Sequence, residues 1–160
     1  MFLILFRKNI LTKMKILDQP KDIRLKIMDF LSRREHSSKE IFKKMSSRVE
    51  SKEMLLDSIE ELVNDGLLSD ERFAESYFQS RKNKGYGPLR IRNELKQRGI
   101  GDQIYFSLSN EVDWSKYALE VLKKKINGDI PTETKGVLKL KRFLNYRGFD
   151  FQDIDRAFEL

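Results

Sequence analysis

The residues best placed to do chemistry in this sequence are cations gathered around an aromatic ring. Arginine and lysine bind phosphate oxygens and carboxylates, and an exposed ring can stack on a nucleobase. Such a group suits either nucleic-acid phosphates or an acidic protein surface, although charge runs are also common on helix faces that only meet solvent. The candidate partner-binding residues are Arg81, Lys84, Tyr86, Arg90, Arg92 and Lys96.

Two of these cations, Arg92 and Lys96, lie one helical turn apart on the same side. Like charges at this spacing lower helix stability by about 0.2 to 0.5 kcal/mol. We therefore expect an interaction outside the helix to compensate for the repulsion.

Catalytic and metal-binding chemistry is otherwise scarce. The chain has one histidine, His36, and no cysteine, so a thiolate nucleophile, a zinc site or a histidine relay is not expected. No phosphate-cradling glycine motif occurs. Asp150, Asp153 and Asp155 match no calcium loop and are more typical of a helix start. The sequence predicts a protein that is not an enzyme and needs no cofactor or metal.

The elements that position the cations are predicted by an internal repeat. Leu95 to Ile100 reappear as Leu144 to Phe149, an offset of 49 residues (144 minus 95). The match extends upstream, and a fainter copy precedes both, as expected of a duplicated helical unit. The repeat also places a second cationic strip in the last unit, consisting of Lys139, Lys141 and Arg142.

Helix boundaries follow from local signals. Ser37 and Glu40 form the pattern of a capping box, and Gly87 followed by Pro88 predicts a helix that begins at the proline. Glycines that follow apolar helical runs predict left-handed helix ends. These are Gly66, Gly99 and Gly148.

Together these patterns predict an all-α fold, an elongated tandem array of three three-helix repeats that resemble helix-turn-helix units. We expect an N-terminal extension at residues 1–20 and repeats at 21–68, 69–110 and 111–160. The apolar start of the extension is too short to cross a bilayer and has no cleavage signal, and Met14 is an alternative translation start. A cytoplasmic monomer is expected, since nothing favours disulfides or a membrane.

Charge alternates with the repeat. The chain carries a net charge of +7, and in each unit the middle helix is basic while the third helix is acidic. Separated strips of opposite sign would orient a charged partner, although for any single helix mutual attraction between neighbouring helices is the simpler explanation. Arg98 and Arg147 precede terminating glycines, so we assign them to helix-end carbonyls. The aromatic residues at helical spacing are expected in the core, namely Phe73, Tyr77, Phe78 and Trp114.

The central unit of the predicted repeat closely resembles the RecX regulatory family. The resemblance rests on LSDERFA at residues 68–74, SR at 80–81, GxGPxRIxxEL at 85–95 and RGI at 98–100. RREHS at 33–37 with EI at 40–41, and KRFLxxRGF at 141–149, are similar to the family's other signatures. The resemblance covers residues 21–160.

The resemblance implies a bacterial cytoplasmic protein of three-helix repeats that binds the RecA recombinase, chiefly as its filament on single-stranded DNA. It would inhibit ATP hydrolysis and strand exchange in recombination and DNA repair. Two other functions stay open: sequence-independent DNA binding without RecA, and a structural helical adaptor. A groove-reading helix-turn-helix is disfavoured because the recognition helix of the simple version is the third, and here the third helices are acidic.

Overall fold

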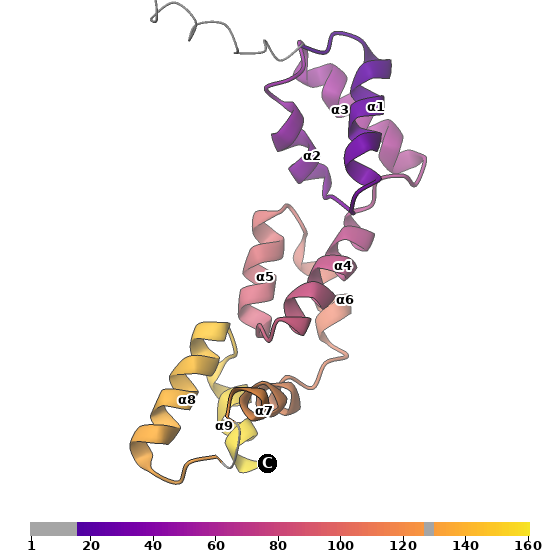
Figure 1. Cartoon of the computed structure of the whole chain (residues 1–160). Coiled ribbons are helices and arrows are strands. Elements are labelled where there is room, and N and C mark those ends of the chain that lie inside the picture. The colour runs from indigo at the N-terminus through magenta and orange to yellow at the C-terminus, as the bar shows by residue number, and fades with distance from the viewer. Residues whose placement is uncertain (1–15, 127–129) are drawn as a thin grey trace, which may run out of the picture.

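The computed structural model describes residues 16–126 and 130–160, and these residues form an elongated array of helices (Figure 1). The N-terminal stretch predicted to be an apolar extension lies mostly outside the described residues. Within the described residues the chain forms helices and a single β-bridge. The helices are α1 (Pro20–Leu31), α2 (Ser38–Met45), α3 (Lys52–Asn64), α4 (Asp70–Asn83), α5 (Pro88–Gln97), α6 (Asp102–Ser109), α7 (Trp114–Lys125), α8 (Thr134–Arg147) and α9 (Phe151–Glu159).

The apolar residues gather into three separate cores, one for each set of three helices. The first core belongs to α1–α3, the second to α4–α6 and the third to α7–α9, and we call these sets unit 1, unit 2 and unit 3. Phe73 and Phe78 are buried in unit 2, as predicted, while Tyr77 and Trp114 are partly buried against it. The all-α tandem fold is therefore confirmed. The division of the chain after residues 68 and 110 remains our proposal, supported by these three cores.

Local signals explain the helix ends. The Ser37 hydroxyl accepts a hydrogen bond from the Glu40 backbone N–H, and α5 begins at Pro88 after a Gly87 cap. The three predicted terminating glycines all have positive φ, as does Gly85. The second half of the capping box does not form. The Glu40 carboxylate instead contacts the His36 ring, because that ring is buried beside it.

The described end of the N-terminal extension is part of unit 1. The Leu17 backbone pairs with the loop between α2 and α3, with its N–H 2.8 Å from the Arg48 carbonyl and its carbonyl 2.9 Å from the Glu50 N–H. Leu17 also packs against the first core. Unit 1 therefore includes residues that we assigned to the extension.

The middle helices α2, α5 and α8 stack end to end along one side of the array (Figure 1). At the lower joint, between units 2 and 3, the N–H groups of Gly87 and Leu89 donate to the carbonyls of Arg147 and Gly148, both at 2.9 Å. At the upper joint, between units 1 and 2, the Ser37 hydroxyl donates to the Arg98 carbonyl at 2.7 Å. At both joints the carbonyl end of one middle helix thus meets the N-terminal end of another, an arrangement that the helix dipoles favour. We call this stack the middle-helix column.

Candidate partner-binding surface

The predicted cations of unit 2 do not form one free patch, and they lie along α4 and α5 from the lower joint to the last turn of α5. Two of the predicted cations come together around one carboxylate, Glu94. Arg81 Nε lies 2.7 Å from one Glu94 oxygen and Arg90 Nε lies 3.0 Å from the other. The Tyr77 hydroxyl donates to the same carboxylate at 2.7 Å. Arg81 therefore links α4 to α5 through Glu94, while Arg90 pairs with the same carboxylate within α5.

This network also sets the ionisation of its central carboxylate. Burial alone would raise the pKa of Glu94, but hydrogen bonds from Tyr77 and Arg90 and the charge of Arg81 outweigh it, so the pKa is lowered. Glu94 is thus held as the anion that two arginines require.

Tyr86 is covered more than we expected for an exposed stacking ring. The Arg90 guanidinium lies 3.9 Å from the ring centroid, and Arg147 of unit 3 lies 5.3 Å from it. The ring is partly buried because the Gly85–Gly87 turn is where α8 meets α5. The prediction of an exposed aromatic at this position is wrong to that extent.

Arg92 pairs with a carboxylate of its own unit. We had expected an interaction outside the helix to compensate for its repulsion with Lys96. Its guanidinium makes two hydrogen bonds to Asp102, the first residue of α6, at 2.9 and 2.7 Å. The hydrogen bond from Arg92 lowers the pKa of Asp102. The repulsion between Arg92 and Lys96 is therefore offset within unit 2, and no external anion is needed to explain it.

The remaining predicted cations differ in their pairing. In unit 3, Lys141 is paired with Asp155 at 2.7 Å. The other four have no carboxylate within 4.0 Å of their side-chain nitrogens among residues 16–126 and 130–160, and all four are exposed. These four are Lys84, Lys96, Lys139 and Arg142.

The two arginines assigned to helix ends have different partners. Arg98 donates to the Glu94 carbonyl of its own helix at 2.7 Å, as predicted, and also lies 3.5 Å from Glu40 of unit 1. Arg147 does not cap its own helix. Its Nη1 donates across the lower joint to the Lys84 carbonyl at 2.6 Å, because α4 ends directly beside α8.

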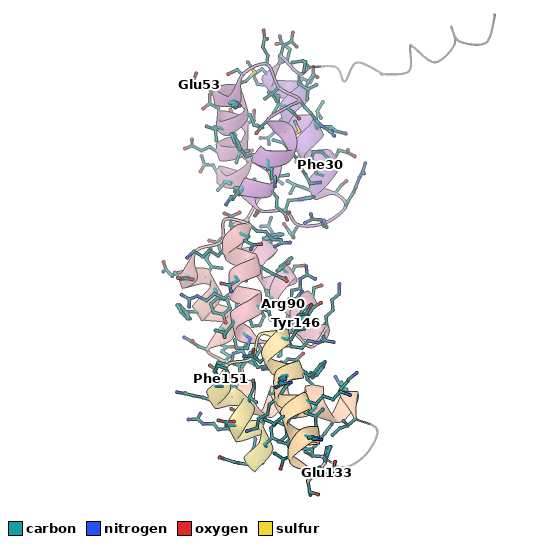
Figure 2. All side chains as sticks on the ribbon, turned by 90° about the vertical axis from the view of Figure 1, so that its left-hand side faces the viewer. Phe30, Glu53, Arg90, Glu133, Tyr146 and Phe151 are labelled. Atoms are coloured by element: carbon teal, nitrogen blue, oxygen red, sulfur yellow. The ribbon has the colours of Figure 1, made fainter. Side chains whose placement is uncertain are left out.

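One residue on this surface was missed. Tyr146, in the last turn of α8, is 81% exposed. It lies near Arg90 on the side of the molecule that carries the middle-helix column (Figure 2). The internal repeat could have predicted this exposed ring. Tyr146 occupies the repeat position of Gln97, a polar residue that faces solvent in unit 2.

Other chemistry is not evident in the described part of the chain. His36 lies in the α1–α2 turn, as predicted, where burial lowers its pKa despite its hydrogen bond to Glu40. Asp150 caps α9 by accepting from the Asp153 N–H. Residues 16–126 and 130–160 contain no cluster of acidic or histidine side chains suited to a metal, and none of their helices is long and apolar enough to cross a membrane.

Comparison with known proteins places these features in a family. Residues 69–105, which hold the Glu94 network, match the family model described as RecX, second three-helix domain. The chain is 40% identical over 143 residues to the regulatory protein RecX of Pseudomonas entomophila, covering 88% of this chain and 92% of the relative. It is 38% identical, with the same coverage, to the regulatory protein RecX of Pseudomonas syringae pv. tomato.

Solved structures show the same fold. The crystal structure of RecX from Lactobacillus salivarius superposes with a TM-score of 0.74 at 23% identity, covering 88% of this chain and 94% of that one. A second crystal structure, of regulatory protein RecX, gives a TM-score of 0.70 at 22% identity, covering 88% and 72%. At these identities the structural likeness shows the arrangement of helices alone.

Proposed function

The chain belongs to the RecX family of regulatory proteins, and from that premise we propose that it binds the RecA filament on single-stranded DNA and inhibits RecA ATP hydrolysis and strand exchange. It acts by binding and catalyses no reaction of its own. We further propose that it works as a monomer in the cytoplasm, where the filament forms.

The observation that carries this proposal is the middle-helix column. Each of its three helices carries a net positive charge, and their end-to-end joints align these helices along one side of an elongated molecule (Figure 1). A filament presents the same subunit surface repeatedly along its axis. An elongated protein can therefore make several modest contacts with it, and these contacts add through multivalency.

The structure changes which cations are the useful probes of this surface. Reversing Arg90 or Arg92 would break the contacts with Glu94 or Asp102, and a loss of activity would then report on folding. The exposed cations Lys96, Lys139 and Arg142 have no such partner among the described residues. We therefore choose these three for charge reversal.

The test is RecA ATP hydrolysis on single-stranded DNA, titrated with this protein. The triple variant Lys96→Glu, Lys139→Glu, Arg142→Glu should need about tenfold more protein for half-inhibition, since each exposed charge contributes up to about 1 kcal/mol. Rising salt should weaken inhibition by the wild type more than by the variant, because exposed charges are screened.

A matched control makes the same change in net charge away from the column. The control variant carries Lys21→Glu, Lys52→Glu and Lys123→Glu, which are exposed positions on α1, α3 and α7. It should inhibit like the wild type. Equal inhibition by all three proteins would remove the column from the mechanism, and no inhibition by saturating wild-type protein would refute the regulatory proposal itself.

A further inference from the structure

A cationic pocket lies at the lower joint, where the C-terminal ends of α4, α7 and α8 meet. It has a volume of about 200 Å³. Its charged lining comes from all three helices, and we call it the junction pocket. The four cations that line it are Lys84, Lys124, Lys125 and Arg147.

The junction pocket differs in charge from the predicted cluster on α5. Among the described residues, no carboxylate is part of its lining. None lies within 4.0 Å of the side-chain nitrogens of its four cations in the described ranges 16–126 and 130–160. On α5, by contrast, Arg90 and Arg92 are already neutralised by Glu94 and Asp102. Among the described residues, the cations of this joint that lack a directly paired carboxylate are therefore gathered in the pocket.

Two features keep the pocket formed and open. Arg147 is held by its hydrogen bond to the Lys84 carbonyl and by packing against the Phe143 ring, 5.1 Å from the centroid, so its other N–H groups are preoriented donors. At Gly85, where φ is +77°, a Cβ atom would lie 3.4 Å from Arg147 Nη1 and 3.5 Å from the Val121 methyl groups. The missing side chain leaves this space empty.

Each cation alone has a simple structural explanation. Lysine and arginine are favoured in the last turn of a helix, where they interact with its free carbonyls. Three helix ends that meet at one point, however, bring four positive groups into the lining of one cavity, where they repel one another. An anion in the cavity relieves that repulsion.

From this arrangement we infer that the junction pocket binds a phosphodiester group of single-stranded DNA. The cavity is smaller than the roughly 300 to 1,000 Å³ of sites that enclose a drug-sized ligand, so it takes a phosphate rather than a whole nucleotide. A phosphodiester charge is matched by point-like lysine donors and by a fixed arginine fork. The inference rests on the proposed function in that it supplies a direct DNA contact beside the filament-facing column.

The test uses the full chain and bare oligonucleotides, without RecA, so its result is independent of RecA inhibition. Lys124→Gln, Lys125→Gln is the pocket variant, because both side chains are exposed and neither holds the lower joint together. Lys21→Gln, Lys52→Gln is the control, with the same charge change in unit 1. Binding of oligo(dT) is measured by fluorescence anisotropy over a series of salt concentrations.

Loss of one phosphate contact on single-stranded DNA should reduce the slope of log affinity against log salt by about 0.7 in the pocket variant. The loss should be the same for oligo(dT) and oligo(dA), since a phosphate carries no sequence information. The control should keep the wild-type slope. A methylphosphonate oligonucleotide, whose backbone is neutral, should bind the wild type and the pocket variant equally weakly.

Three results would overturn the assignment. The first is a pocket variant with the wild-type slope and affinity. The second is a thymidine mononucleotide that binds as tightly as the oligonucleotide, which would make the ligand a free nucleotide. The third is a pocket variant that loses binding to polyglutamate but not to DNA, which would make the occupant an acidic peptide. Each of these results is compatible with inhibition of RecA by the protein. The pocket assignment can therefore be refuted while the proposed regulatory function stands.

Discussion

The lower joint should be unusually sensitive to one added methyl group, at Gly148. This glycine ends α8 with a φ of +92°, and its carbonyl accepts the Leu89 N–H of unit 2. A Cβ built at Gly148 would lie 2.7 Å from the Arg90 backbone nitrogen and closer still to the Arg90 Cβ. Because those atoms belong to the first turn of α5, the Gly148→Ala variant can relieve the clash only by moving unit 3 away from unit 2.

Gly66→Ala provides the matched control. Gly66 also follows a helix with positive φ, at +69°, but no atom lies within 4 Å of its Cβ position. An L-residue in the left-handed region costs about 1 to 2 kcal/mol, and both variants incur this cost. Overpacking adds about 1 to 3 kcal/mol in Gly148→Ala alone. Its Tm should therefore lie about 2 to 12 °C below that of Gly66→Ala.

Thermal unfolding followed by circular dichroism measures this difference. Hydrogen exchange then locates it, because the Gly87 and Leu89 amides that cross the joint should lose protection in Gly148→Ala and keep it in Gly66→Ala. Equal Tm values for the two variants, or unchanged protection of both amides, would show that the joint tolerates the methyl group. The end-to-end packing of α8 on α5 would then be looser than the contacts indicate.

Two further changes test the contacts within and between units. Glu94→Gln should lower the free energy of unfolding by about 1 to 3 kcal/mol through the loss of charged hydrogen bonds from Tyr77 and Arg90, as measured by urea unfolding. Because the folded pKa of Glu94 is lowered, its contribution is complete above the ordinary value of 4.5 and is lost as pH falls through the lowered pKa; a wild type and variant whose stabilities fall in parallel over that range would contradict this. Ser37→Ala should cost about 1 kcal/mol more than Ser51→Ala, since both residues cap helices but only Ser37 also donates across the upper joint, and equal losses would contradict that role.

Local features of the chain were predictable because they depend on near neighbours in sequence. Ser37, Gly87 and Gly148 act at helix ends through their own backbone preferences, which no distant contact needs to supply. The capping box failed in its second half because Glu40 found a buried partner, His36, in the same turn. The motif therefore predicts correctly that the Ser37 hydroxyl accepts from the Glu40 N–H, but it does not predict that the Glu40 carboxylate contacts His36.

Charge pairing was not predictable to the same degree. Arg81 and Glu94 lie on different helices, and Arg147 contacts a carbonyl 63 residues away in the chain. Sequence analysis named Arg81, Arg90 and Arg92 as candidate cations, but it could not tell that each of them already had an anion within unit 2. The exposed ring was likewise assigned to Tyr86, although the structure covers that ring and exposes Tyr146 instead.

The sequence by itself determined the repeat, the helices, their ends and the basic character of the middle helix in each unit, because periodicity, caps and charge are written in residues a few positions apart. Tertiary structure alone decided that α2, α5 and α8 align in one column and that three helix ends form a pocket whose described lining holds four cations and no carboxylate. The physical reason is distance. Coulombic attraction and hydrogen bonding act over a few ångströms in space, and only the folded chain brings residues of different units within that range.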